Sequence, residues 1–249
     1  MKRLLLYLLV VMGWLLSGCQ KEVTKDETAS LKIAISHLAG NAPLSLNTAY
    51  TNAFGESLTL TKYKYYLSNI ALIDERDNKH FIPESYFLVD EGQEASKTLF
   101  AQAPVGTFKA ISFLIGVDSI RNVSGAQAGV LDPYHDMFWT WNTGYIMAKL
   151  EGTSPQSGQV NNKVEYHIGG FKGENNVLRT ITLPLGQTYT LNKDNSLQVA
   201  ISADLLQWFN GVHALKIADA PVTMSPGALA ARFADNYARM FTLTAVQVQ

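Results

Sequence analysis

The chain has 249 residues, a formal net charge of −1 at neutral pH and one cysteine. This nearly balanced charge provides no electrostatic footprint for nucleic acid, so we expect no nucleic-acid partner. An intramolecular disulfide needs two cysteines, so the fold must depend on a hydrophobic core, for which this length is sufficient.

The first 18 residues are typical of an export signal, because two basic residues precede an apolar run from Leu4 to Leu16 that is too short for a convincing membrane span. The run ends in Leu-Ser-Gly-Cys, which is similar to the bacterial lipobox. We therefore expect residues 1–18 to be a lipoprotein signal peptide, Cys19 to anchor the chain to a membrane through acyl chains, and residues 19–30 to be a flexible tether. The residue after the cysteine is Gln20 rather than an aspartate, which in bacterial lipoproteins favours sorting to the outer membrane. We therefore expect the protein at the periplasmic face of this membrane or at the cell surface.

Strand patterns dominate the rest of the chain. Leu31 to His37 alternates between apolar and polar residues, with His37 on the apolar face. Further segments with a strand pattern are 58–60, 63–72, 86–89, 106–117, 138–151, 162–167, 176–185, 187–191 and 241–248. Many short strands separated by turn residues favour a sandwich or a partly open barrel.

Two segments have a helical period. Ser202 could cap a helix that carries Leu205 and Phe209 and stops at Gly211. A second helix is expected after Ser225-Pro226, with apolar residues at 229, 233 and 237. With no internal repeat and no long linker, we expect residues 31–249 to form one all-β domain, an antiparallel β-sandwich with two short helices.

The segment from Leu131 to Gly152 is the most informative part of the chain. Trp139 and Trp141 stand two residues apart, and on one strand they would point to the same face. Such a pair forms either an aromatic core layer or part of a redox or metal site. A second segment, YHIGGF, places His167 before two glycines, where the backbone can approach another group closely.

His37, His135 and His167 lie at predicted strand ends or turns. Each alone is more typical of a core, rim or loop residue, but three of them beside the tryptophan pair indicate a shared site. Imidazole suits zinc, copper, iron and nickel. Asp132 and Asp136 fit turn chemistry better than a calcium site, although calcium stays an open alternative.

Common catalytic and cofactor motifs do not occur in the sequence. It contains no zinc-type cysteine and histidine cluster, no His-Glu-x-x-His, no Gly-x-Ser-x-Gly, no haem-attachment motif and no phosphate loop. By elimination, a small metal site is favoured over hydrolysis or nucleotide chemistry, and we expect a protein that is not an enzyme.

Several phrases together resemble the MbnP-like family of copper-binding proteins, which is associated with methanobactin loci. They are ISHLAGNAPLSLNTAYTNAFGE (Ile35 to Glu56), KYYLSNIAL (Lys64 to Leu72), MFWTWNTGYIMAKLEG (Met137 to Gly152), YHIGGFKG (Tyr166 to Gly173), and MSPG with ADNYARMF (Met224 to Phe241). The family resembles the surface copper proteins MopE and CorA, in which a tryptophan oxidised to kynurenine joins histidines around copper(I).

The resemblance implies copper as the bound metal, with His37, His135 and His167 as candidate ligands. It also implies that Trp139 or Trp141 is oxidised to kynurenine by a di-haem peroxidase-type partner similar to MauG. The resulting hypothesis is a lipid-anchored envelope protein that captures or hands over copper.

Two alternatives stay open at this point. One is a β-sandwich lipoprotein without metal that binds a protein or a glycan and uses both tryptophans as core. The other is an electron-transfer partner in which Trp139 or Trp141 relays a hole.

Overall fold

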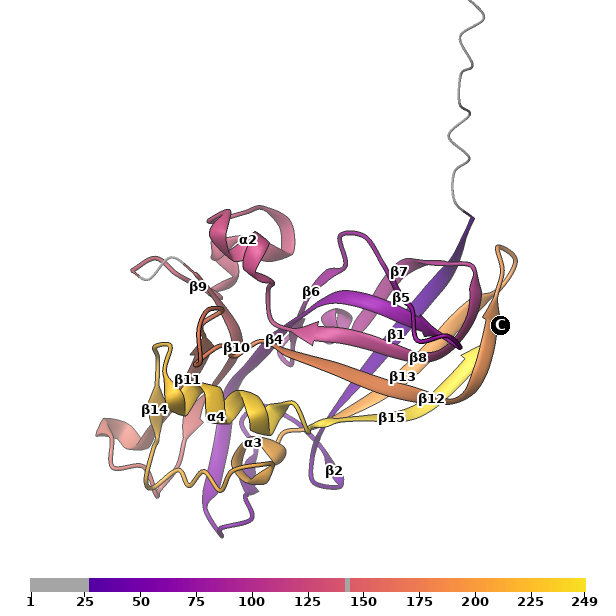
Figure 1. Ribbon diagram of the computed structural model, residues 1–249. Coiled ribbons are helices and arrows are strands. Elements are labelled where there is room, and N and C mark those ends of the chain that lie inside the picture. Colours follow the sequence, from indigo (N-terminus) through magenta and orange to yellow (C-terminus); the bar gives the residue numbers. More distant parts are fainter. Residues whose placement is uncertain (1–26, 142–143) are drawn as a thin grey trace, which may run out of the picture.

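The computed structural model describes residues 27–141 and 144–249, so the predicted signal peptide and Cys19 lie outside the described residues. Two β-sheets pack around one hydrophobic core, and α3 (Gln207–Asn210) and α4 (Ala228–Tyr237) lie at one end of the molecule (Figure 1). The predicted β-sandwich with short helices is confirmed. No helix in the described ranges is long and apolar enough to cross a membrane.

The five-stranded sheet has the order β15-β13-β1-β2, with β7 also paired to β1. Its strands are β1 (Thr28–Ala39), β2 (Ala42–Pro43), β7 (Thr98–Pro104), β13 (Ser196–Asp204) and β15 (Phe241–Val248). The ten-stranded sheet has the order β12-β8-β4-β10-β11-β14, with β3, β5 and β6 paired to β4 and β9 paired to β10. Its strands are β3 (Ala49–Thr51), β4 (Ser57–Asp74), β5 (Lys79–Phe81), β6 (Tyr86–Asp90), β8 (Gly106–Ile115), β9 (Phe138–Trp139), β10 (Gly144–Thr153), β11 (Lys163–Gly169), β12 (Arg179–Leu191) and β14 (Val222–Thr223).

Helical turns connect these strands. Besides α3 and α4, the described chain has one more α-helix, α2 (Ser119–Val123). It follows β8 and was not expected from the sequence. The 3-10 helices are η1 (Glu94–Lys97), η2 (Gly129–Leu131), η3 (Pro133–His135) and η4 (Val160–Asn162).

The sheets are mixed rather than purely antiparallel, because β1 runs parallel to β13 and β11 runs parallel to β14. The segment around Ser202 belongs to β13, where Leu197, Val199 and Ile201 alternate into the core. The expected helix therefore starts later, at Gln207, and Asp204 instead accepts a hydrogen bond from the backbone N–H of Leu206.

The second predicted helix, α4, begins after Gly227 rather than at the Ser225-Pro226 pair. Phe233 and Tyr237 are buried as its apolar spacing predicts. The Phe233 ring lies 4.4 Å from that of Tyr166, centroid to centroid, so α4 packs on the inner face of β11.

The long strand β4 has two chemically different faces. Tyr63 and Tyr65 are fully buried and face the core, whereas Lys62 and Lys64 alternate with them and face outward. His37 from β1 meets the tyrosine face, with ring centroids 5.0 Å from Tyr63 and 5.5 Å from Tyr65.

His37 is a hydrogen-bonded core residue. Its Nδ1 lies 2.6 Å from a carboxylate oxygen of Glu91 and its Nε2 lies 2.7 Å from the hydroxyl of Tyr65. A carboxylate only accepts hydrogen bonds, so Nδ1 carries a proton, and in the neutral imidazole Nε2 accepts from Tyr65. Both ring nitrogens are therefore occupied inside the sandwich.

Glu91 is expected to make folding pH-dependent. Although burial opposes ionisation, the hydrogen bond and charge of His37, together with Lys97, lower the pKa of Glu91 from the ordinary value of 4.5. A carboxyl whose native pKa is lowered contributes stability above its unfolded pKa and loses that contribution as the pH falls through the native value.

We therefore predict that Glu91→Gln loses less stability than the parent chain as the pH falls below 4.5. Urea unfolding at a series of pH values measures this difference. The other paired carboxylates contribute the same pH-dependent change in unfolding free energy to both proteins, so their contributions cancel in the comparison. Parallel stability curves for the two proteins would contradict the assigned role of Glu91.

Candidate metal site

The tryptophan pair lies at a hairpin rather than on one strand. The predicted strand 138–151 is divided into β9 and β10, and residues 140 and 141 belong to the turn between them. Trp139 is 5% exposed and Trp141 is 66% exposed, although their ring centroids are 5.4 Å apart. The prediction that both indoles share one face of a single strand is therefore wrong, and the two residues have different environments.

Trp139 packs directly over Gly169 of β11. A Cβ atom on Gly169 would lie 2.5 Å from Cζ3 of Trp139, so only glycine permits this approach. The indole Nε1 of Trp139 is buried and has no hydrogen-bond partner among the described residues. A buried donor without a partner is costly, and Trp139 shares this feature with Trp208 in the core.

His167 lies on the same outward face of β11 as Gly169, two residues earlier along the strand. Its Nε2 is 2.8 Å from a carboxylate oxygen of Glu151 on β10. Glu165 shares this face, and the three residues have potential ligand atoms that all lie within 4.8 Å of one another. Among the described residues, this is the group of three histidine or carboxylate side chains that could hold one metal ion.

The hydrogen bond to Glu151 determines which nitrogen of His167 is free. Because the carboxylate accepts, the neutral ring keeps its proton on Nε2 and leaves a lone pair on Nδ1. Carboxylates hold metal-binding histidines in this way in many metalloproteins. The bond from His167, with the nearby charge of Lys62, lowers the pKa of Glu151 to about 2, so Glu151 stays ionised.

Lysine side chains compensate the carboxylates around His167. Lys62 Nζ lies 2.9 Å from Asp136 and 3.2 Å from Glu151, and Lys149 Nζ lies 2.8 Å from Asp136. Burial opposes the ionisation of Asp136, but these two ammonium groups lower its pKa to about 2. Burial lowers the pKa of Lys149, although the ion pair with Asp136 limits the shift.

The cluster therefore has no excess of negative charge. Glu165 also has a lysine partner, because Lys163 Nζ lies 2.7 Å away, so three ammonium groups match the carboxylates of Asp136, Glu151 and Glu165. Calcium takes six to eight oxygen ligands, mostly carboxylate and carbonyl groups. Asp132 caps η3 by accepting from the backbone N–H of Tyr134, and Asp136 is paired with lysines, so both carboxylates have local structural roles.

The three predicted histidine ligands do not come together in the structure. Lys149 on β10 is opposite Lys64 on β4 and His167 on β11, so His167 lies on the outward face with the two lysines. Ala148 is opposite Tyr65, which lies on the inward face that meets His37. His135 lies in η3, where its Nε2 is 3.0 Å from the carbonyl oxygen of Gly129. Of the three, the structure places only His167 in the candidate group.

Sequence reasoning missed Glu151 and Glu165. Glu165-x-His167 has the spacing of two side chains on one strand face, and this signal could have identified the pair. The pairing of Glu151 with Glu165 across β10 and β11 depends on the register of the two strands, which the sequence does not specify.

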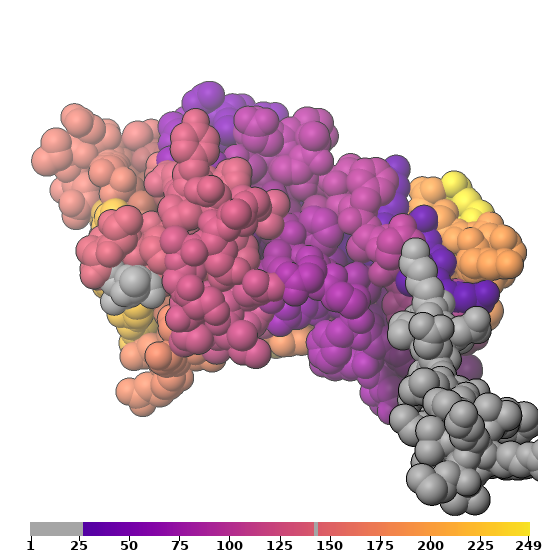
Figure 2. All heavy atoms as spheres, turned by 90° about the horizontal axis from the view of Figure 1, so that it is seen from above, coloured from indigo at the N-terminus to yellow at the C-terminus, as the bar shows by residue number. Residues whose placement is uncertain are grey.

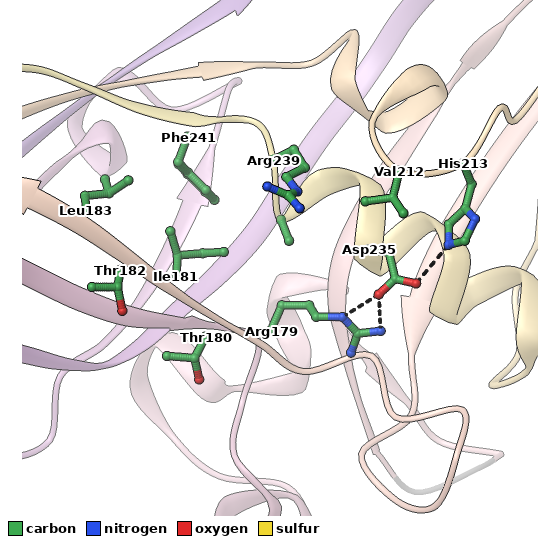
Figure 3. Close-up of a pocket in the computed structure, with 11 residues that line it drawn as sticks. Arg179, Thr180, Ile181, Thr182, Leu183, Val212, His213, Asp235, Arg239 and Phe241 are labelled. Atoms are coloured by element: carbon green, nitrogen blue, oxygen red, sulfur yellow. Dashed lines mark hydrogen bonds and ion pairs between the residues drawn. The ribbon is translucent and has the colours of Figure 1, made fainter.

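A second group of charged residues lines a surface hollow where β12, β15 and α4 meet (Figure 3). Asp235 connects His213, whose Nε2 is 2.9 Å away, with the guanidinium of Arg179 at 2.8 Å. Arg179 also donates to the carbonyl oxygens of Asn176 and Leu178. The ion pair between Arg179 and Asp235 links β12 to α4, which gives this group a structural role.

The contact between Trp139 and Gly169 leads to a direct test. Gly169→Ala should destabilise the fold by about 1–3 kcal/mol, the usual cost of overpacking, and should move Trp139 toward solvent. Denaturant unfolding and tryptophan fluorescence measure the two effects. Gly158→Ala is the matched control, because a Cβ at Gly158 has no neighbour within 4 Å. Equal stability of both variants would show that Trp139 does not require glycine at 169.

Comparisons with known proteins support this fold. The chain is similar to a solved structure of MbnP from Methylosinus trichosporium, with a TM-score of 0.53 and 14% identity, over 88% of this chain and 99% of that chain. A search of curated proteins found no significant match. The model of the MbnP family matches residues 28–225, most of the chain. The chain therefore belongs to the MbnP family.

Proposed function

We propose that this protein binds copper at the outward face of β10 and β11 and holds it at the cell envelope for capture or transfer. The observation that carries the proposal is the position of His167. Glu151 orients its ring through Nε2, and it lies two residues before Gly169, on which Trp139 packs. Membership of the MbnP family, which resembles the copper proteins named above, favours copper among the metals that imidazole accepts.

The charge balance around His167 favours a singly charged copper(I) ion over a divalent ion. Nδ1 of His167 is a neutral ligand, and the matched lysines leave no net negative charge to attract a doubly charged cation. A singly charged ion adds less uncompensated charge to this partly buried face. In this proposal Glu151 positions His167 through Nε2, and Glu165 stays paired with Lys163.

Trp139 is the candidate for conversion to kynurenine. Its indole borders the same strand face as His167, and an aniline nitrogen formed there would add a ligand to the site. Trp141 is exposed and its ring lies 5.4 Å from that of Trp139, which suits an electron relay toward a di-haem partner of the MauG type. The lipid anchor at Cys19 would keep the protein on a membrane, and the protein would act as a carrier rather than an enzyme.

The copper site is tested by metal stoichiometry. After anaerobic loading with copper(I) and desalting, the purified chain should retain one tightly bound copper, and His167→Ala should retain none. His213→Ala is the matched control, because His213 is also a carboxylate-paired histidine but lies in the structural group with Asp235. Retention of copper by His167→Ala, or its loss in His213→Ala, would contradict the site.

The assignment of the two tryptophans gives a separate prediction. In protein isolated from cells that contain its partner, peptide mass spectrometry should detect kynurenine at position 139 and unmodified tryptophan at position 141. Trp141→Phe should reduce the kynurenine yield at 139 if the exposed ring relays the electron. Kynurenine at 141 alone would contradict this assignment.

A protein-interaction module is the second candidate function. The segment between β8 and β10 exposes large apolar side chains, including Ile120 at 77%, Tyr134 at 92% and Trp141 at 66% exposure. Figure 2 shows this part of the chain, coloured rose, at the surface of the face seen from above. Capture of an envelope partner that persists without copper and is lost in Tyr134→Ala would favour this candidate.

A further inference from the structure

The hydroxyl of Tyr65 differs from those of the other buried tyrosines. Six tyrosine side chains in the described residues are almost completely buried: Tyr63, Tyr65, Tyr66, Tyr145, Tyr166 and Tyr237. Four of these hydroxyls donate to backbone carbonyl oxygens, and that of Tyr63 donates to the sulfur of Met240. Tyr65 alone among the six donates to a base, Nε2 of His37, at 2.7 Å.

The base is itself oriented and connected toward the surface. Glu91 accepts from Nδ1 of His37 at 2.6 Å, and Lys97 Nζ lies 3.3 Å from the same carboxylate oxygen. The side chain of His37 is fully buried, whereas those of Glu91 and Lys97 are 7% and 13% exposed. A hydrogen-bonded line therefore runs from the core hydroxyl to a carboxylate near the surface.

We propose that Tyr65 is a redox-active tyrosine that is oxidised with transfer of its proton to His37. One electron passes from Tyr65 to a high-potential one-electron oxidant outside the chain. The O–H bond of Tyr65 breaks, and its proton forms an N–H bond with Nε2 of His37. The products are a neutral tyrosyl radical, an imidazolium ion and the reduced oxidant.

The surroundings of Tyr65 and His37 explain why Tyr65, rather than another buried tyrosine, is the one oxidised. A tyrosine that loses an electron and keeps its proton becomes a cation, which is costly in an apolar core. The imidazole removes that charge from the ring, and the imidazolium is compensated by the ionised carboxylate of Glu91. A carbonyl oxygen or a thioether is too weak a base for this role, so the other five hydroxyls do not satisfy the requirement.

Other redox-active rings extend the site through the core. The Tyr63 ring lies 5.5 Å from Tyr65 and 5.9 Å from Trp208, and Trp208 lies 5.2 Å from Tyr237. If one of these rings is oxidised, an electron can pass to it from Tyr65 along the row. The radical then resides on Tyr65, where proton transfer to His37 stabilises it. The inference concerns the inner face of β4 and does not depend on copper at His167.

The experiment generates the oxidant by light. A ruthenium(III) tris-bipyridine complex, formed by flash-quench, oxidises the purified chain, and electron paramagnetic resonance of frozen samples detects organic radicals. Growth with ring-deuterated tyrosine identifies a tyrosyl signal by its narrowing. All samples carry Tyr134→Phe, because Tyr134 is 92% exposed and would react directly.

We expect a persistent tyrosyl signal that disappears in Tyr65→Phe and remains in Tyr66→Phe, the control on the same strand. His37→Gln should lower the radical yield about a hundredfold, within the range that a positioned base contributes. If circular dichroism shows that His37→Gln is unfolded, Glu91→Gln replaces it, and the radical yield should again fall.

Three results would overturn the proposal. The first is a parent chain without a tyrosyl signal although the ruthenium complex is reduced. The second is a signal that survives in Tyr65→Phe, which would place the radical elsewhere, for example at the half-buried Tyr86 beside Asp118. The third is an unchanged yield in a folded His37→Gln or Glu91→Gln variant.

Discussion

The alternation of side chains across the layer formed by β4, β10 and β11 determines the chemistry of this protein. Successive residues of a strand point to opposite faces, so Tyr65 and Lys64 direct their side chains to different sides of the same layer. The inner side contains the aromatic core and His37, and the outer side contains His167 among charged groups. A slip of one residue in register would exchange the two faces, so the buried aromatic residues also fix the outer site.

Each face uses a carboxylate to orient an imidazole, with opposite consequences. Glu91 holds Nδ1 of His37 and directs Nε2 at a tyrosine hydroxyl, so this ring has no lone pair left for a metal. Glu151 holds Nε2 of His167 and leaves Nδ1 with its lone pair. The same pair of residue types therefore produces a proton acceptor inside the sandwich and a candidate metal ligand outside it.

The sequence predicted the class of fold and most strands because period-two alternation is local, as in the segment from Leu31 to His37. It failed where tertiary contacts decide the outcome. The pattern around Ser202 fits a helix cap, yet pairing with β1 draws it into a strand. Three histidines near strand ends suggested one site, but the pairing of Lys149 with His167 and of Tyr65 with Ala148 separates His167 from His37. Register is a long-range property that one sequence does not display.

The central claim is that His37 and His167 belong to separate sites on opposite faces of one layer. Nitrogen-15 NMR of the histidine side chains, recorded before and after anaerobic addition of copper(I), tests it most directly. The account predicts that the ring nitrogens of His167 shift on copper binding while those of His37 keep the signature of a protonated Nδ1. Coordination shifts at both histidines with one bound copper would contradict it.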